Sequence, residues 1–291
     1  MNQFVSFSSP GAPPDPATVL SPADFRAIAD LLHREARIAL TPQKATLVSS
    51  RLARRLRIRG VRDFADYIRL VGTDPEEKRA MIEALTTNHT HFFREAHHFE
   101  HLVKEMVPQW RARSSREPIR IWSAACSSGE EVYSIAMSLL GRERREALWA
   151  KQAPVRLLAT DISSEMVAAV RKATYAHTSL EAIPEAYRRL WVRDSGDQFA
   201  MTDEVRDMVT PLVLNLFDRW PMRHRFDAIF CRNVMIYFNE ATKAELTARL
   251  VAQLAPGGAL YIGHSERLMP PVSDRMTVAG HTIYVKPEGQ P

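Results

Sequence analysis

IRIWSAACSSGEEVYSIA, residues 119–136, is the stretch that decides the fold. It begins with an apolar run, Ile119–Trp122, that suits a short buried strand, and it continues through small residues as far as Gly129. A helix is then expected from Glu130 onward. A strand, a tight loop of small side chains and a helix start form the first crossover of a doubly wound nucleotide-type site, where a ligand can approach free backbone N–H groups.

The two glutamates that begin this helix, Glu130 and Glu131, set the charge of the expected site. Carboxylates repel a phosphate and attract a cation. The amino or sulfonium group of S-adenosylmethionine is such a cation. Gly129 is the only glycine of the loop, so the G-x-G-x-x-G pattern of dinucleotide sites is absent, which favours a nucleoside ligand without a pyrophosphate.

A third acidic residue, Asp161, ends the next expected strand, Val155–Thr160, and lies 32 positions after Gly129. An acidic residue at this place typically accepts hydrogen bonds from ribose hydroxyls. The alternative is a helix-capping role, because Ser163 and Ser164 follow directly. Asn215, Asn233 and Tyr237 follow other apolar runs and are candidates for the same edge of the sheet, although each alone also suits a turn or a cap.

Alternating strands and helices continue to the end of the chain and predict a mostly parallel sheet. A short antiparallel excursion, a β-subdomain, is expected at about residues 187–213. The expected strands are Ile119–Trp122, Val155–Thr160, Phe226–Phe230 and Ala259–Ile262, with Pro256-Gly257-Gly258 as a turn and a final hairpin of Met276–Ala279 and Thr282–Val285; the helices are Glu130–Leu140, Ser164–Lys172 and about Glu240–Leu254.

The N-terminal part of the chain predicts a small all-helical domain at residues 21–85, behind a proline-rich tail (1–20) that we expect to be disordered. Ser-Pro and Thr-Pro pairs at positions 21 and 41 suit two helix starts. Further helices are expected at about Val61–Leu70 and at Pro75–Leu85 behind an Asp74 cap. Residues 86–118 would connect this domain to the sheet domain at 119–291.

The second of these helices has a basic face. Between Thr41 and Arg62 the chain carries seven basic residues and no acidic one. One interpretation is a solvated helix face. The other is a docking surface for an acidic protein or nucleic acid, although the lack of interleaved aromatics disfavours single-strand stacking. The candidate docking residues are Lys44, Arg51, Arg54, Arg55 and Arg59.

Composition excludes several classes of protein. The chain has 291 residues, 45% hydrophobic and 25% charged, with a net charge of +5. No apolar run reaches about 18 residues and no secretory signal is evident, so we expect a cytoplasmic protein. Only two cysteines occur, so a disulfide framework is not expected. The G-x-S-x-G pattern of a nucleophile elbow is absent, and so are the H-E-x-x-H and paired C-x-x-C patterns of zinc sites.

A dense histidine cluster lies at positions 89, 91, 97, 98 and 101. His97 and His101 have the i, i+4 spacing of metal ligands on a helix. No carboxylate or cysteine pattern completes the set, so from the sequence we expect no metal.

Five motifs together resemble the CheR-type chemoreceptor glutamate methyltransferases of bacteria, over residues 21–285. The resemblance implies a Rossmann-like S-adenosylmethionine-binding α/β domain with a small antiparallel β-subdomain, behind an all-helical domain that faces the receptor. The motifs are TTNHTHFFREAHHF (86–99), IWSAACSSGEEVYSIAM (121–137), ATDIS (159–163), FDAIFCRNVMIYF (226–238) and GHSE (263–266). Val132 and Ser128 depart from the family's usual proline and threonine, without removing an expected ligand contact.

The resemblance also implies roles for individual residues. Glu131 would bind the methionine end of S-adenosyl-L-methionine and Asp161 its ribose, and Arg94 and Tyr237 would lie nearest the transferred methyl group. The product would be S-adenosyl-L-homocysteine. The implied cofactor-binding residues are Asn88, Thr90, Arg94, Glu131, Asp161, Asn215, Leu216, Asn233 and Val234.

The implied activity is methylation of glutamate side chains in the cytoplasmic helical region of chemoreceptors, by a monomer that binds no nucleic acid and does not insert into the membrane. Family members that dock on a receptor's C-terminal pentapeptide share a glycine-rich loop in the β-subdomain. Here the loop reads VRDSGDQF (192–199), with Gly196 alone, so we expect docking without a pentapeptide. Two alternatives remain open: a methyltransferase of the same fold acting on nucleic acid or a small molecule, and a cofactor-binding regulatory protein without catalysis.

Overall fold

The computed structural model describes residues 19–113, 117–152 and 154–289. Within them the chain forms two compact units, residues 19–35 with 39–86, and residues 36–38 with 87–289. The expected tail, residues 1–20, lies outside the described residues apart from its last two. No helix in the described part of the chain combines the length and apolar character that crossing a membrane requires.

The first unit is helical, as expected from its proline and aspartate caps. Asp74 accepts hydrogen bonds from the backbone of Glu76 and Glu77, and Asp63 accepts one from Asp66. The expected helix start at Val61 is therefore wrong by three residues, since Asp63 is the N-cap. The helices are α1 (Pro22–Ala36), α2 (Ala45–Arg59, after the 3-10 turn η2, Pro42–Lys44), α3 (Phe64–Thr73) and α4 (Pro75–Leu85).

The second unit contains a seven-stranded sheet with strand order β6-β2-β1-β7-β8-β10-β9. Neighbouring strands from β6 to β8 run parallel, and β10 runs antiparallel to both β8 and β9. The order reverses between β1 and β7, which is where ligands bind in doubly wound sheets. The strands are β1 (Ile119–Ala124), β2 (Val155–Asp161), β6 (Val209–Val213), β7 (Phe226–Cys231), β8 (Leu254–Ile262), β9 (Thr277–Gly280) and β10 (Ile283–Val285).

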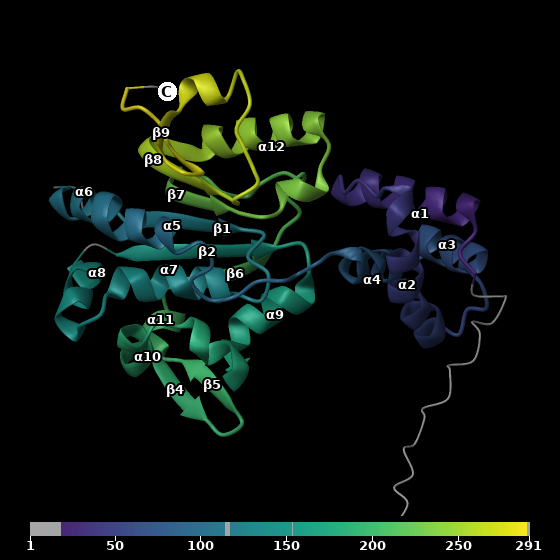
Figure 1. Ribbon diagram of the computed structural model, residues 1–291, viewed down its shortest axis with the longest axis horizontal. Coiled ribbons are helices and arrows are strands. Elements are labelled where there is room, and N and C mark those ends of the chain that lie inside the picture. The colour runs from purple at the N-terminus through teal and green to yellow at the C-terminus, as the bar shows by residue number, and fades with distance from the viewer. Residues whose placement is uncertain (1–18, 114–116, 153, 290–291) are drawn as a thin grey trace, which may run out of the picture. The chain divides into compact units, whose positions relative to one another are not determined.

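Helices cover both faces of this sheet. Figure 1 shows α7 (Glu130–Leu140) and α9 (Ser164–Lys172) on one side and α12 (Glu240–Gln253) on the other, as right-handed crossovers require. A further helix precedes β1: α5 (Ala96–His101) continues through a π turn, η3 (Leu102–Met106), into α6 (Val107–Ala112). The π turn adjoins Pro108, which has no N–H for the helical ladder.

A three-stranded antiparallel sheet, the β-subdomain, packs beneath α7 in Figure 1, with strand order β3-β5-β4. Its bounds differ from the expected 187–213. It begins at β3 (Thr174–Ala176), which is too short to show a period, and it includes α10 (Glu185–Trp191), β4 (Val192–Ser195), β5 (Gln198–Met201) and α11 (Asp203–Arg206). Val209–Val213 instead pairs with β2 as the edge strand of the large sheet, where Pro211 is tolerated.

Another expectation fails at Pro256-Gly257-Gly258, which is part of β8 and not a turn. Gly257 donates to the carbonyl of Lys286 and Gly258 accepts from its N–H, so the segment continues the ladder. Between Phe226 and Ala228 the pairing of β7 with β8 shifts register to accommodate the extra residues. The expected strand Ala259–Ile262 begins five residues earlier, at Leu254, and the other expected strands and crossover helices are confirmed to within two residues at each end.

Candidate active site

The loop after β1 has an unusual backbone, in which three residues have positive φ values. Ala125 and Ser127 have φ values of 60° and 50°, and Gly129 has a φ of 101°. A Cβ atom at Gly129 would lie 2.9 Å from the Tyr175 hydroxyl and 3.0 Å from Val170. The loop is thereby held tightly against α9 and the β-subdomain, at the carboxyl end of the sheet.

Asp161 joins this loop to the end of β2. Its carboxylate accepts hydrogen bonds from the N–H of Ser127 and the N–H of Ser163, both at 2.9 Å. A helix-capping role was the alternative for Asp161 in the sequence. In the structure the N-cap of α9 is Ser163, whose hydroxyl accepts a hydrogen bond from the N–H of Met166. Asp161 is buried at the strand end and holds the two loops together.

Glu131 forms a buried ion pair with a residue from the other side of the switch point. Its carboxylate lies 3.0 Å from Nη1 of Arg232 and accepts a hydrogen bond from the Ser123 hydroxyl at 2.7 Å. Burial raises the pKa of Glu131, while the positive charge of Arg232 opposes that shift. The loops after β1 and β7 are therefore joined by charge as well as by packing.

Arg232, which was not among the candidates expected from the sequence, connects several segments of the site. Its guanidinium donates to the backbone carbonyl of Arg94 and lies 3.5 Å from the Glu95 carboxylate, over the ring of Phe99. It is 2% exposed. The one available signal was an arginine directly after the apolar strand FDAIFC, since a buried cation needs anionic partners.

Glu266, from the GHSE motif, was also missed. Its carboxylate accepts from the N–H groups of Gly263, Asn233 and Met235 at 2.6, 3.1 and 2.8 Å. Asn233 has a φ of 58°, a left-handed conformation that these bonds stabilise. Burial raises the pKa of Glu266, against the lowering effect of these hydrogen bonds. The turn that carries Asn233 and Val234 is fixed in this way.

The segment before α5 lies along the loop after β1. The Asn88 carbonyl accepts a hydrogen bond from the Ser127 hydroxyl at 2.8 Å, and the Phe93 N–H donates to the Ser134 hydroxyl of α7. Arg94 donates to the carbonyl of His89 at 3.2 Å. Thr90 lies between them and is half-buried.

The remaining candidates lie on the loops after β6 and β7. Asn215 follows Leu214, whose N–H donates to the Asp161 carbonyl, and its side chain accepts from the N–H of Phe217. The Leu216 carbonyl accepts from Trp220 and Arg249. Tyr237 donates to the carbonyl of Thr87 at 3.4 Å, which brings the β7 loop to the segment that carries Asn88.

These residues fit S-adenosylmethionine better than a phosphate-bearing ligand. Two carboxylates, Glu131 and Asp161, stand at the carboxyl edge beside a loop of small residues. The nearest buried cation, Arg232, already pairs with Glu131 and Glu95. Carboxylates can accept from ribose hydroxyls and an ammonium group, whereas a phosphate would meet the same negative charge.

The candidate docking residues lie in the first unit, and three of them hold α2 to α4. Arg51 donates to the Thr86 carbonyl at 2.7 Å, Arg55 to both oxygens of the buried Glu77 carboxylate, and Arg59 to Asp74. Arg54 is exposed and Lys44 half-buried. The basic face is thus partly a structural element of the helical unit.

Comparisons with known proteins give the same two-part division. Residues 23–86 match the family model "CheR methyltransferase, all-alpha domain", and residues 88–285 match "CheR methyltransferase, SAM binding domain". Three relatives are similar along most of their length. They are a probable chemotaxis protein methyltransferase of Rhizobium etli (40% identical, covering 87% of this chain and 96% of the relative), chemotaxis protein methyltransferase 2 of Pseudomonas aeruginosa (39%; 90% and 92%) and the chemotaxis protein methyltransferase of Escherichia coli (39%; 91% and 91%).

Proposed function

The chain belongs to the CheR methyltransferase family and is a methyltransferase that uses S-adenosylmethionine, and we propose that its substrates are glutamate side chains of bacterial chemoreceptors, which it converts to methyl esters. The observation that carries the proposal is that both family domains occur in order over residues 23–285. The likeness to curated chemotaxis methyltransferases, across about nine-tenths of each chain, supports it.

S-adenosylmethionine, when bound, supplies an electrophilic methyl group. Glu131 would hold its ammonium group and Asp161 its ribose hydroxyls, which suits the acceptor oxygens that both carboxylates present. The other residues proposed to line the cofactor site are Asn88, Thr90, Arg94, Asn215, Leu216, Asn233 and Val234.

The chain's own residues have no proton to remove from this substrate. A glutamate side chain with a pKa of about 4.3 is already ionised at neutral pH. Catalysis then depends on alignment of the carboxylate with the methyl group and on exclusion of water. We assign these tasks to Arg94 and Tyr237, which approach the site from the segment before α5 and the loop after β7.

The helical unit is proposed to receive the substrate. Glutamate-rich receptor helices would be attracted to the basic face of α2, in the cytoplasm and without nucleic acid, by a monomeric enzyme. Since Arg51, Arg55 and Arg59 also have partners within the unit, exposed Arg54 is the residue through which this attraction can be tested most directly.

The β-subdomain supports a proposal about docking. Only Gly196 and Asp197 separate β4 from β5, so the hairpin is tight and has no extended glycine-rich loop. We therefore propose that a C-terminal receptor pentapeptide is not required. Calorimetric titration with a pentapeptide ending in the Trp-x-x-Phe pattern should show no binding, and submicromolar binding would contradict the proposal.

Methyl transfer is tested directly with labelled S-adenosylmethionine and membranes that contain candidate receptors. Label in the receptor that mild base releases as methanol is the expected result, because methyl esters hydrolyse under these conditions. Label in nucleic acid or in small molecules would favour the other methyltransferase functions. Binding of S-adenosylhomocysteine without any transfer would favour a regulatory protein.

A further inference from the structure

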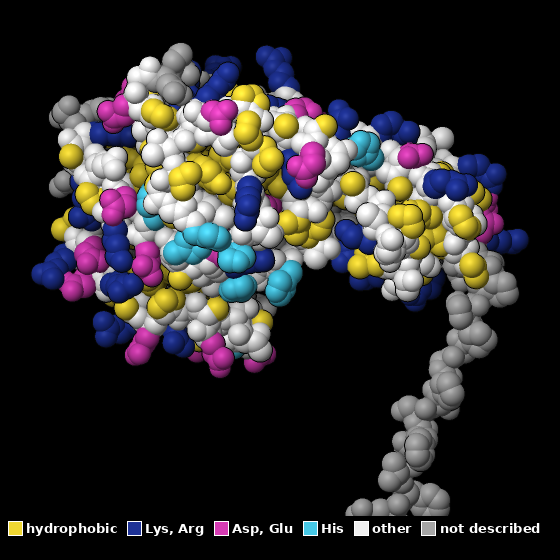
Figure 2. Space-filling view, turned by 45° about the horizontal axis from the view of Figure 1, so that its top comes forward, with side chains coloured by type: hydrophobic (Ala, Val, Ile, Leu, Met, Phe, Trp, Pro, Cys, Tyr) yellow, Lys and Arg dark blue, Asp and Glu magenta, His cyan; other side chains and the backbone are white. Residues whose placement is uncertain are grey.

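A group of histidines and one carboxylate outside the proposed cofactor contacts has an unexplained arrangement of hydrogen-bond acceptors. Glu95, at the N-cap of α5, and His97 and His98, in its first turn, each offer a ligand atom, and these atoms all lie within 4.8 Å of one another. Figure 2 shows histidine side chains gathered on one face of the larger unit.

The tautomer of His98 follows from its neighbours. The hydroxyl of Thr282 donates to the carbonyl of His281 at 2.6 Å, so its proton is used. The contact of 2.9 Å between that hydroxyl and Nε2 of His98 is then a bond in which the His98 N–H donates. Nδ1 of neutral His98 carries no proton and presents a lone pair.

That lone pair faces a second acceptor. Nδ1 of His98 lies 3.7 Å from Oε2 of Glu95, and for both buried atoms no hydrogen-bond partner is found among the described residues. The other carboxylate oxygen of Glu95 serves Arg232 and the N–H of His264. Two buried acceptors that point at one another are costly unless a cation lies between them.

His97 completes the group from the solvent side. Its Nε2 lies 3.0 Å from the carbonyl of His281, which can only accept, so this nitrogen carries the proton of the neutral ring and Nδ1 is left with a lone pair. Metal-binding histidines characteristically donate their other N–H to an oxygen in this way. Both imidazoles therefore already have the outer hydrogen bonds of metal ligands.

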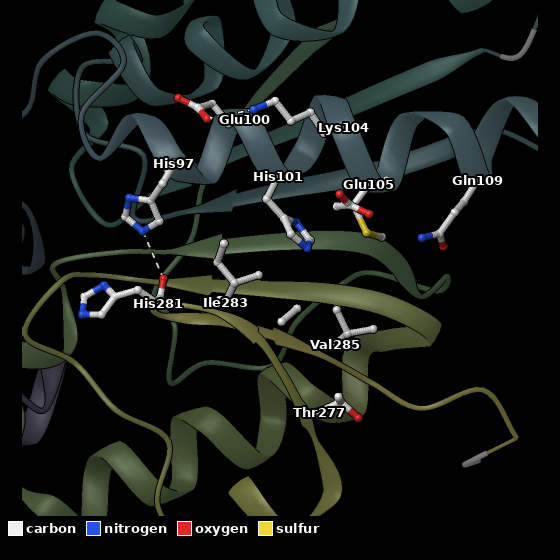
Figure 3. A pocket seen from close by; sticks show the side chains of 13 residues that line it. His97, Glu100, His101, Lys104, Glu105, Gln109, Thr277, His281, Ile283 and Val285 are labelled. Atoms are coloured by element: carbon white, nitrogen blue, oxygen red, sulfur yellow. Dashed lines mark hydrogen bonds and ion pairs between the residues drawn. The ribbon is translucent and has the colours of Figure 1, made fainter.

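A groove of about 700 Å³ has His97 among its lining residues. It runs between the helix that begins with α5 and the hairpin of β9 and β10, and His97 and His281 lie at one end of it, as Figure 3 shows. His97 thus brings the group of three ligand atoms to the edge of a solvent-filled groove.

We propose that Glu95, His97 and His98 form a binding site for one divalent transition-metal ion of the zinc type, with the remaining position left to solvent. Two nitrogens and one oxygen suit zinc, and tetrahedral ligands of zinc lie about 3.3–3.6 Å apart, close to the separation of His98 and Glu95. From the sequence we expected no metal because no carboxylate completed the histidine spacing. Glu95 is that carboxylate, and its left-handed backbone, with φ of 59°, places it over the first turn of α5.

The experiment uses full-length protein without a polyhistidine tag, freed of metal by chelation. Titration with Zn²⁺ should show one ion per chain with a Kd below about 10 μM. Co²⁺ at the same site should give the visible absorption of a four- or five-coordinate ion. His97→Ala and the isosteric Glu95→Gln should each weaken Zn²⁺ binding at least about tenfold, while His224→Ala, in an exposed loop, should not change it.

The folding of each variant is checked by circular dichroism, and His97→Ala, at the rim of the groove, is the variant least expected to disturb the core. Wild-type protein that fails to bind Zn²⁺ at that affinity, or equal binding by the wild type and both ligand variants, would overturn the proposal. So would nitrogen NMR shifts showing that His98 is doubly protonated at neutral pH in the metal-free protein, because Nδ1 would then donate to Glu95.

Discussion

Arg232, just after β7, and Glu131, in the first turn of α7, are 101 positions apart in the chain and form one buried ion pair at 3.0 Å. The pair links the two loops that meet where the strand order of the sheet reverses. The same guanidinium also holds the carbonyl of Arg94, so it connects three segments of the proposed site. The first prediction concerns this connection.

Arg232→Gln is expected to weaken binding of S-adenosylhomocysteine about tenfold or more, because it leaves the Glu131 carboxylate buried without its counter-charge. Without Arg232 the pKa of Glu131 rises further. Only the ionised carboxylate attracts an ammonium group. As the solution is acidified, the variant should therefore lose its affinity for S-adenosylhomocysteine at a higher pH than the wild type does. Calorimetric titration over a range of pH measures both effects.

Arg232→Lys serves as the graded variant. Lysine keeps the charge but lacks the planar fork that reaches Glu131 and the Arg94 carbonyl together, so an intermediate loss is expected. If both variants bind S-adenosylhomocysteine as the wild type does at every pH, Glu131 is not a cofactor ligand.

Arg94→Ala is expected to lower kcat/KM for receptor methylation by about 100-fold or more, since its proposed task is alignment of the reacting groups. The free energy of unfolding should change by less than about 1 kcal/mol, because Arg94 is only half-buried. Initial rates with labelled cofactor and chemical unfolding measure the two quantities. Arg156→Ala, an exposed position on β2, is the control, and an unchanged rate would remove Arg94 from the site.

Glu77→Gln is expected to destabilise the helical unit by about 3 kcal/mol, because the buried carboxylate pairs with Arg55 and accepts from the Tyr67 hydroxyl. Burial tends to raise the pKa of Glu77, but the hydrogen bonds from Arg55 and Tyr67 and the positive charges of Arg55 and Arg59 outweigh it, so the pKa lies below its usual value. The stabilisation is complete above the pKa of the unfolded chain, about 4.3, and is lost as the pH falls through the lower pKa of the folded unit.

Hydrogen exchange of α2 and α4, followed by mass spectrometry in the full-length protein, resolves this unit from the other. Protection in the wild type should decline on acidification below about pH 4.3 more steeply than in Glu77→Gln. Parallel declines in the two proteins would show that Glu77 does not carry the effect.

Arg54→Glu is expected to slow receptor methylation several-fold at low ionic strength, and the difference should shrink as salt is added, because the proposed attraction to acidic receptor helices is screened. Folding should be retained, since Arg54 is exposed. Arg69→Glu, on α3 of the same unit, is the matched control, because Arg69 is also exposed. Equal rates for all three proteins would leave the basic face as a solvated surface.

The helical unit shows why charge reversal at other positions of α2 is less informative. Arg55→Glu would place a carboxylate beside buried Glu77, and Arg51→Glu would remove the bond to the Thr86 carbonyl. Both are expected to lower the stability of the unit together with any effect on the receptor. From the sequence these residues could not be told apart from Arg54, because spacing shows a shared face but not the partners across it.

Much of this protein is determined by local sequence. The small residues before Gly129, the cap at Asp74, and the alternation of apolar strands with amphipathic helices predict the elements, because these signals act within a few residues. The start of α3 was placed three residues too early because the cap at Asp63 was not recognised. The parallel sheet and the carboxyl-edge placement of Asp161 and Glu131 follow from that alternation. Thr174–Ala176 was not predicted as a strand and Val209–Val213 was assigned to the β-subdomain, because short strands and edge strands with proline lack a distinct period.

Only the tertiary structure decided which polar groups face one another. The ion pair of Arg232 with Glu131 and the three backbone hydrogen bonds to Glu266 join residues from separate loops. The acceptors of His98 and Glu95 face one another because Glu95 has a left-handed backbone conformation. Such contacts depend on chain crossings and on the exclusion of water. Periodicity and spacing along a single segment carry no information about either.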